Sequence, residues 1–317
     1  MKQKIVVVGS LHIDFVINVP HFPSPGETVV GSNFQVFPGG KGANQAYAAA
    51  KLGGSVSMVG QVGGDAQADW LKKNLASVGV DVSAVRRDPK NPSGTAGISI
   101  DPSGQNQILI MPGANGTFGP AQLKESKEIL ESAGIVLLQL EIPLETVEAA
   151  VHLANKAGAV VMLDPAPARD LPDSLLHLVD YLTPNENELA ALTGAPPSAG
   201  IGREHAVQRA RILIERGANK VIVKMGPHGA LLVTKDQEHF WPVVSVEVVD
   251  TTAAGDAFNA AFAVALVAGK SEMQAGQFAT AAGACSVTRQ GAQPSMPTRN
   301  EVELMMKVSG HSAQSGF

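Results

Sequence analysis

The chain has 317 residues, a formal net charge of −5 and a sequence pI near 5.9. This charge leaves no basic field for nucleic acid or for an anionic membrane surface, so neither partner is expected, and an anionic ligand must be held by local groups. The single cysteine, Cys285, excludes an intramolecular disulfide and favours a reducing cytoplasm, and no apolar run approaches the ~20 residues that span a bilayer.

The first third of the chain predicts strands and helices in alternation. Residues 4–10 (K-I-V-V-V-G-S) are typical of a buried strand, and residues 15–19 and 29–37 predict two further strands. A helix is expected from the glycine-rich stretch P-G-G-K-G-A-N-Q-A, and a strand and a second helix follow before Gly79. Residues 95–111 then predict a hairpin around a D-P-S-G turn, which interrupts the alternation.

The second half of the chain predicts a regular α/β body. Amphipathic helical patterns separate four short runs that are typical of strands: I-V-L-L-Q-L-E, A-V-V-M-L-D-P, Y-L-T-P-N and K-V-I-V-K-M-G. Residues 257–268 are apolar except for Asn259 and predict a buried helix. A second helix rich in small residues is expected at 273–287, and the polar tail from Ser309 is expected to fray.

These elements predict one α/β domain over residues 1–317. Parallel strands need helical crossovers, so we expect an open, mostly parallel, doubly wound sheet with helices on both faces. The hairpin and the early strands are expected to form a small β-sheet lid from about 14–38 and 95–112.

The polar residues of the chain collect after the predicted strands, where ligands bind to open parallel sheets. They are Asp14 after the first strand, Gly39 to Asn44 at a helix start, Glu141 after L-L-Q-L, Asn185 to Glu188 after Y-L-T-P, Gly226 to Gly229 after V-I-V-K-M, and Asp256 after V-E-V-V-D. Singly, each has a structural alternative, such as a turn residue at Asp14, a strand-end charge at Glu141, a helix cap at Asn185 or a solvated charge at Lys41. Together they favour one site.

Residues 248–262 (V-V-D-T-T-A-A-G-D-A-F-N-A-A-F) place a small-residue turn and a carboxylate ahead of an apolar helix. Backbone N–H groups in the first turn of a helix lack intrahelical partners, so Ala253, Ala254, Gly255 and Asp256 could cradle a phosphate. The alternative is that Asp256 is an ordinary helix N-cap.

The stretch P-G-G-K-G-A-N-Q-A is the second candidate ligand site. It is not a Walker A loop, because no Ser or Thr follows Lys41, and the first strand is not followed by G-x-G-x-x-G. It offers the bare backbone of Gly39, Gly40 and Gly42 with one ammonium and one carboxamide, which suits the hydroxyl groups of a polar neutral ligand.

This stretch, paired with D-T-T-A-A-G-D-A-F-N near the end of the chain, resembles the ribokinase-like (PfkB) family of carbohydrate kinases. G-S-L-H-I-D, N-E-N-E, K-M-G-P-H-G and T-R-Q-G-A-Q-P-S occur in the family's order, so the resemblance covers essentially the whole chain. It implies an ATP-dependent kinase that phosphorylates the primary hydroxyl of a pentose, D-ribose first. Magnesium, a monovalent cation expected to be potassium, and a homodimer paired through the lid sheets are implied as well.

The resemblance also implies a role for each matching residue. Asp256 corresponds to the catalytic base, expected to be ionised and weakly basic, and Ala253, Ala254 and Gly255 correspond to the anion hole. The sugar would be bound by His12, Asp14, Gly39, Gly40, Lys41, Asn44, Glu141 and Asp256. The nucleotide would be bound by Asn185, Lys224, Gly226, Gly229, Gly255 and Thr280. Asn185 and Glu188 would order magnesium through water, and the monovalent cation would lie near Asp250, Thr252, Ser286, Arg289, Gly291 and Ser295.

His12 departs from the family pattern, which usually has asparagine there as a sugar ligand. Histidine is bulkier and titrates near neutral pH, so a different sugar or a nucleoside stays open, as does a His12 that only points into the core. Lys224, often threonine in relatives, is a smaller departure. A rival of another class is a non-catalytic sugar-binding regulator, and an oxidoreductase ranks last because the glycine fingerprint is missing.

Overall fold

The computed structural model describes residues 2–196 and 201–308, so the tail predicted from Ser309 lies outside the described residues. Its largest element is an open sheet, whose strands in spatial order are β13 (Glu238–Trp241), β12 (Ala230–Val233), β11 (Val221–Lys224), β10 (Tyr181–Leu182), β9 (Val160–Leu163), β8 (Ile135–Leu138), β1 (Lys4–Val8), β4 (Ser55–Gly63) and β5 (Val85–Asp88). The pairs from β11 to β5 are parallel, and β12 and β13 add an antiparallel edge. The predicted open and mostly parallel sheet is confirmed.

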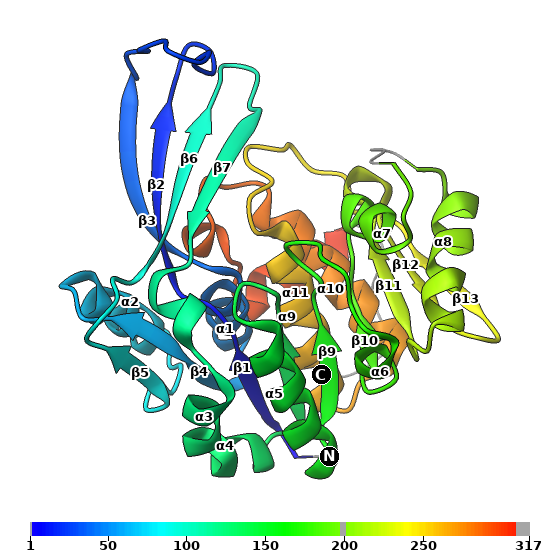
Figure 1. Cartoon of the computed structure of the whole chain (residues 1–317). Coiled ribbons are helices and arrows are strands. Elements are labelled where there is room, and N and C mark those ends of the chain that lie inside the picture. The colour runs from blue at the N-terminus through cyan, green and yellow to red at the C-terminus, as the bar shows by residue number, and fades with distance from the viewer. Residues whose placement is uncertain (1, 197–200, 309–317) are drawn as a thin grey trace.

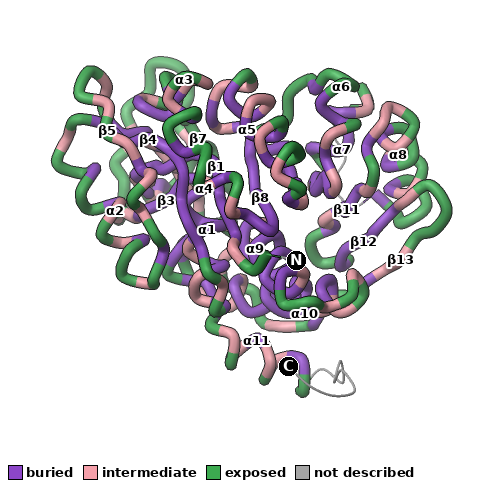
Figure 2. Tube along the Cα trace, turned by 90° about the horizontal axis from the view of Figure 1, so that it is seen from below, coloured by how far each residue is buried: buried purple, intermediate pink, exposed green. Residues whose placement is uncertain are grey.

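Alternate side chains of the central strands enter two separate cores, one on each face of this sheet. On β1, Ile5 and Val7 pack into one core with α1, α9 and α10, whereas Val6 and Val8 pack into the other with α5 and α8. The helices in chain order are α1 (Lys41–Lys51), α2 (Gln67–Ser77), α3 (Pro120–Leu123), α4 (Lys127–Glu131), α5 (Leu144–Lys156), α6 (Asp173–Leu176), α7 (Glu186–Leu192), α8 (Arg203–Glu215), α9 (Ala254–Val267), α10 (Glu272–Ser286) and α11 (Arg299–Val308). Figure 2 shows the buried strands enclosed by exposed helix surfaces, as a doubly wound sheet requires. Among the described helices, none is long and apolar enough to cross a membrane.

A second, four-stranded sheet stands apart from the body (Figure 1). Its order is β3 (Asn33–Gly39), β2 (His12–Asn18), β6 (Gly94–Ile100) and β7 (Asn106–Met111). The inner pair β2–β6 is parallel, and the two outer pairs are antiparallel. The predicted hairpin is therefore confirmed, and the two early strands join it as expected.

The chain changes direction across the large sheet at β1. After β1 the chain forms β4 and β5 on one side, and it then returns to form β8 and β9 on the other. Segments leaving neighbouring strands in opposite directions open a crevice at their carboxyl ends, where ligands bind to such sheets. Residues after β1 and β8 should therefore meet at a candidate site.

Three features differ from the sequence predictions. The strand β5 (V-R-R-D) was not predicted, because three of its four residues are charged, and the hairpin β12–β13 was not predicted either. Asp256 does not follow a strand, because residues 246–250 form none, and Val246 and Val248 line a cavity instead. Nor is Asp256 a helix cap, since Ala253 occupies the N-cap position of α9.

Candidate active site

The glycine-rich start of α1 packs directly against the backbone that joins β1 to β2. A Cβ on Gly42 would lie only 2.6 Å from the backbone nitrogen of Ser10, and a Cβ on Gly39 only 2.0 Å from Oδ2 of Asp14. Both distances are far below van der Waals contact, and at Gly42 the clash is with backbone that cannot move alone, so glycine is required there. This close packing brings Lys41 and the first turn of α1 to the crevice beside β1.

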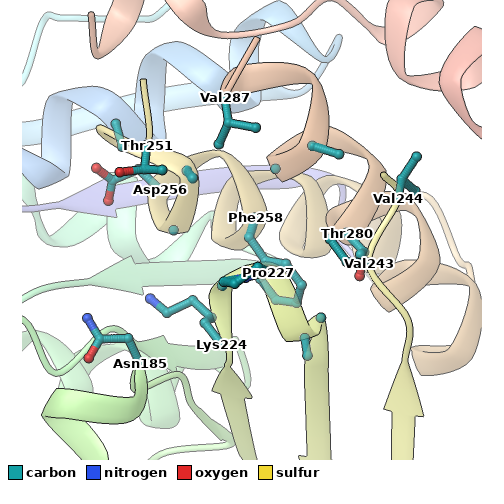
Figure 3. Close-up of a pocket in the computed structure, with 18 of the residues that line it drawn as sticks. Asn185, Lys224, Pro227, Val243, Val244, Thr251, Asp256, Phe258, Thr280 and Val287 are labelled. Carbon is teal, nitrogen blue, oxygen red and sulfur yellow. The ribbon is translucent and has the colours of Figure 1, made fainter. Parts of the chain in front are cut away.

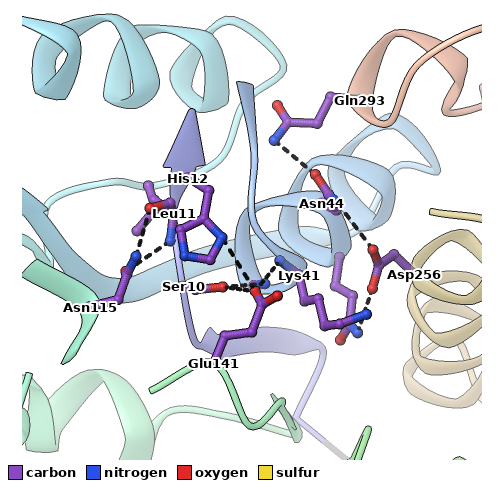
Figure 4. A network of polar contacts seen from close by, with 11 residues as sticks. Ser10, Leu11, His12, Lys41, Asn44, Asn115, Glu141, Asp256 and Gln293 are labelled. Carbon is purple, nitrogen blue, oxygen red and sulfur yellow. Dashed lines mark hydrogen bonds and ion pairs between the residues drawn. The ribbon is translucent and has the colours of Figure 1, made fainter. Parts of the chain in front are cut away.

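Glu141, which follows β8, connects the segments that meet there (Figure 4). Its Oε2 accepts hydrogen bonds from Ser10 Oγ at 2.5 Å and from the backbone N–H of Lys41 at 2.9 Å. Nδ1 of His12 lies 3.7 Å from the same oxygen. Two of the groups predicted from the strand ends, Glu141 and the start of α1, thus meet at the point where the sheet reverses direction.

His12 is 2 % exposed, and its Nε2 has no hydrogen-bond partner within the described residues. Burial lowers the pKa of the imidazole, an effect that the nearby Glu141 carboxylate opposes. Gly94 makes room for the ring, because a Cβ there would lie 2.3 Å from its Cδ2. His12 therefore forms part of the wall beside Glu141 as a buried imidazole with one unsatisfied nitrogen.

Asp256 lies in the first turn of α9 and is 4 % exposed. Its carboxylate accepts hydrogen bonds from Asn44 Nδ2 at 3.1 Å and from Gln45 Nε2 at 3.0 Å. Burial raises its pKa to about 6, and the positive charge of Lys41 opposes this rise. Asp256 is therefore a stronger base than the weakly basic carboxylate expected from the sequence.

Two residues that the sequence predictions missed complete this cluster. Gln45 Nε2 donates to Asp256 and also, at 3.0 Å, to Oδ2 of Asp164, while Lys224 Nζ donates to Oδ1 of Asp164 at 2.9 Å. The amide orientation of Gln45 is fixed because its Oε1 accepts from Gln139 Nε2 at 2.7 Å. Asp164 follows β9, so the strand-end argument that selected Glu141 could have selected it too.

The surrounding carboxylates affect the pKa values of both Lys41 and Asp14. Burial lowers the pKa of Lys41, but the charges of Asp256, Asp164 and Glu141 outweigh this and raise it above its ordinary value. Burial raises the pKa of Asp14 to about 7, and the charges of Glu141 and Asp256 add to the rise. Lys41 is therefore a fixed cation in the cluster, whereas Asp14 and Asp256 are more basic than exposed carboxylates.

A cavity of about 720 Å³ opens beside this cluster. Figure 3 shows Asp256, Lys224 and Asn185 at one end and Val243, Val244 and Thr280 at the other. Of the predicted residues, the cavity is lined by Lys41, Asn185, Glu188, Lys224, Gly226, Gly229, Ala253, Ala254, Gly255, Asp256 and Thr280. A charged end and an apolar end suit a ligand that carries phosphates and a flat base.

The first turn of α9 faces this cavity. Ala253 has φ 59° and ψ 14°, a left-handed conformation that costs a non-glycine residue on the order of 1 kcal/mol. It turns the chain so that the N–H groups of Gly255 and Asp256, which lack partners inside the helix, lie at the cavity. The residues predicted for the anion hole, Ala253, Ala254 and Gly255, all line the cavity, but the N–H of Ala254 already donates to the Thr251 carbonyl at 3.3 Å.

Asn185 and Glu188 form a capping box at the start of α7. Asn185 Oδ1 accepts from the N–H of Glu188 at 2.8 Å, and the Glu188 carboxylate accepts from the N–H of Asn185 at 2.7 Å. Burial raises the pKa of Glu188, and the nearby Lys224 opposes the rise. Both side chains line the cavity, so the cap does not exclude a ligand role.

The residues predicted for a monovalent cation are only partly joined by contacts. Asp250 accepts hydrogen bonds from the N–H of Thr252 at 2.9 Å and of Gly291 at 2.8 Å. The Ser286 and Ser295 hydroxyls are buried and bond to nearby carbonyls, while the Arg289 guanidinium pairs with Glu301. Within the described residues, no group of three or more His, Cys, Asp or Glu side chains is arranged to hold a metal ion.

A family model, two curated relatives and a solved structure each match nearly the whole chain. A family model described as pfkB family carbohydrate kinase matches residues 2–299. A ribokinase of Bacillus subtilis is 41% identical over 304 residues, which cover 96% of this chain and 99% of the relative. A deoxyribokinase of Salmonella typhi is 41% identical over 295 residues, which cover 93% of this chain and 95% of the relative. The solved structure of Arabidopsis thaliana ribokinase complexed with ribose and ATP matches with a TM-score of 0.89 at 38% identity, covering 97% of this chain and 99% of that one.

Proposed function

Because the chain belongs to the pfkB family of carbohydrate kinases, we propose that it transfers the γ-phosphate of ATP to the primary hydroxyl of D-ribose, giving ribose 5-phosphate. The observation that carries this proposal is the buried Asp256, which lies in the first turn of α9 at the charged end of the cavity. A base and an anion hole on one helical turn can act on the attacking hydroxyl and the transferring phosphoryl group together.

In this reaction Asp256 accepts the proton of the sugar hydroxyl as that oxygen attacks the γ-phosphate. Its carboxylate is held by Asn44 and Gln45, so its direction is fixed before the sugar binds. The N–H groups of Gly255 and Asp256, behind the turn at Ala253, stabilise charge on the phosphoryl oxygens. Asn185, Lys224, Gly226, Gly229 and Thr280 bind the nucleotide along the cavity that they line.

The sugar binds at the cluster around Glu141. Asp14, Lys41, Asn44 and Glu141 present charged or amide groups there, and the backbone of Gly39 and Gly40 allows close approach. The four-stranded sheet carries His12 and Asp14 on β2, so its closure would bring both to the sugar. A closed lid also excludes water and so limits wasteful ATP hydrolysis.

Glu188 and Asn185 would suit magnesium, and the residues around Asp250 would suit a monovalent cation. Glu188 gives the cavity a hard carboxylate oxygen beside Asn185, which suits Mg²⁺ held through water against the nucleotide phosphates. The bound ion would neutralise phosphate charge. Asp250, Thr252, Ser286, Arg289, Gly291 and Ser295 would hold potassium, several of them through backbone carbonyls.

Deoxyribose is the second candidate substrate, because a deoxyribokinase relative is as similar to this chain as a ribokinase relative. A panel of pentoses, 2-deoxyribose, hexoses and nucleosides, with ADP release as the readout in potassium and again in sodium, separates the possibilities. We expect D-ribose to give the highest kcat/KM and potassium to exceed sodium. Sugar binding without ADP release from any substrate would instead favour the regulator.

We also propose a cytoplasmic homodimer that pairs through the small sheets. The strand registers place five hydrophobic side chains on the face of this sheet opposite Asp14, and all are exposed: Ile17, Phe34, Val36, Leu109 and Met111. A monomer seldom exposes such a contiguous apolar patch, and a second copy of the same sheet would cover it.

Leu109→Asp tests this pairing, because Leu109 is 73% exposed and contributes little to the folded protomer. We expect the wild-type protein to sediment as a dimer and the variant as a monomer with an unchanged circular dichroism spectrum. Leu304→Asp, which alters a 62% exposed leucine on α11, should leave the dimer intact. A wild-type protein that sediments as a monomer at tens of micromolar would contradict the dimer.

A further inference from the structure

Lys224, a proposed nucleotide ligand, forms a charge pair with Asp164 in the wall of the cavity. Lys224 Nζ lies 2.9 Å from Asp164 Oδ1, and the two side chains are 13% and 3% exposed. A buried pair of this kind adds little net stability, because the cost of removing both charges from water offsets their attraction. Its position at the cavity therefore calls for a role in binding or catalysis.

The ammonium of Lys224 lies beside the first turn of α9. A Cβ placed on Gly255 would be 3.2 Å from Lys224 Nζ, and both residues line the cavity. The N-terminus of a helix carries partial positive charge, so a lysine directed at it meets repulsion that an anion would remove. Two positive groups that converge on one point are the arrangement expected around a multiply charged phosphate.

Asp164 holds this ammonium in place. Its Oδ1 accepts from Lys224, and its Oδ2 accepts from the same Gln45 amide that holds Asp256. Because the Gln45 amide is fixed in turn by Gln139, Asp164 has one defined orientation. Lys224 and Asp256 are thus set relative to each other through two side chains, Asp164 and Gln45.

We propose that Lys224 is a catalytic residue that contacts the transferred phosphoryl group, and that Asp164 is its positioning residue. This inference rests on the proposed kinase function. It assigns to Lys224 a share of the charge stabilisation that the backbone N–H groups of α9 supply. Lys224→Met should then lower kcat by about 10²-fold, as loss of one oxyanion donor does.

The test compares Lys224→Met, Asp164→Asn and the double variant. Asp164→Asn should lower kcat about tenfold with little change in the KM for ribose. If Asp164 acts through Lys224, the double variant should be no slower than Lys224→Met alone. A double variant slowed by the product of both effects would overturn the positioning role.

Lys220→Met is the matched control. Lys220 precedes β11 and pairs with Glu272 on α10, away from the cavity, with 28% and 27% exposure. Its loss should leave kcat within threefold of wild type. An effect on kcat as large as that of Lys224→Met, or a Lys224→Met variant within threefold of wild type, would overturn the catalytic role.

Equilibrium titration with ATP and with ADP measures, without turnover, whether Lys224 contacts the γ-phosphate. Lys224→Met should weaken ATP binding at least tenfold more than ADP binding, because only ATP carries the group to be transferred. Equal losses for ATP and ADP would overturn the inference. A wild-type protein that binds ATP but phosphorylates no sugar would instead refute the proposed function, and the titration would still decide the role of Lys224.

Discussion

Replacing Asp256 by asparagine is expected to lower kcat by ~10²–10⁴-fold, the range that removal of a general base produces. Asparagine has nearly the same shape, but its amide cannot accept the proton of the attacking hydroxyl. ATP binding should persist, because the backbone N–H groups at the start of α9 are unchanged. The measurements are kcat from ADP release at saturating ribose and the affinity for ATP from calorimetry.

Asp236→Asn provides the control, because Asp236 is exposed in the turn between β12 and β13 and touches none of the site residues. It should keep wild-type kcat. A kcat for Asp256→Asn above about a tenth of the wild-type value would remove Asp256 from the role of base.

Asp256→Asn should also change how the free energy of unfolding depends on pH. The pKa of Asp256 is raised from 3.8 to about 6, so between these values the unfolded chain releases its proton before the folded protein does. The carboxylate therefore lowers the free energy of unfolding as pH rises through this window, by on the order of 3 kcal/mol above pH 6. Asparagine loses about one hydrogen bond, near 1 kcal/mol, yet removes that penalty. We expect Asp256→Asn to melt higher than wild type at pH 7.5 and no higher at pH 4, measured by thermal unfolding without ligands.

The sequence predicted those parts of the site whose chemistry lies in one continuous stretch. One long motif predicted Lys41 and Asn44 at the start of α1, and the other predicted Asp256 at the start of α9. The unpaired N–H groups of a first helical turn explain why the second motif was read as an anion site. The family predicted from those motifs is confirmed over residues 2–299. The assignment of individual residues to the sugar, the metal ions and the nucleotide stays a prediction.

Side chains that matter only through a tertiary contact could not be predicted in this way. Gln45 lies inside a quoted motif, yet its role depends on Asp164 and Gln139 arriving from two other strands. Residues 246–250 have the composition of a strand, but they wall the cavity instead of pairing with the sheet. Short-range patterns specify conformation, whereas the partner of a side chain is set by the order of strands in the sheet.

Gly42→Ala is expected to have the largest effect on folding. The added methyl would lie 2.6 Å from the Ser10 nitrogen and 2.7 Å from the Gly9 carbonyl carbon, and neither backbone atom can move alone. Overpacking of a dense core typically costs 1–3 kcal/mol, and contact with rigid backbone lies at the upper end of that range. We expect a fall of about 3 kcal/mol in the free energy of unfolding, measured by urea denaturation.

Activity should fall further than this loss of stability explains. If the variant folds, relief of the clash moves the start of α1 away from β1, and α1 carries the Lys41 N–H that bonds Glu141 as well as Asn44 and Gln45. A shift of about 1 Å at positioning groups can cost 10²-fold in rate, so the folded fraction should turn over at least that much more slowly. Gly202→Ala is the control, because among the described residues no atom beyond its two chain neighbours lies within 4 Å of the Cβ it adds. A Gly42→Ala protein that is stable and turns over at the wild-type rate would show that α1 can shift without moving Asp256, and the contacts of Asn44 and Gln45 would then not be what positions the base.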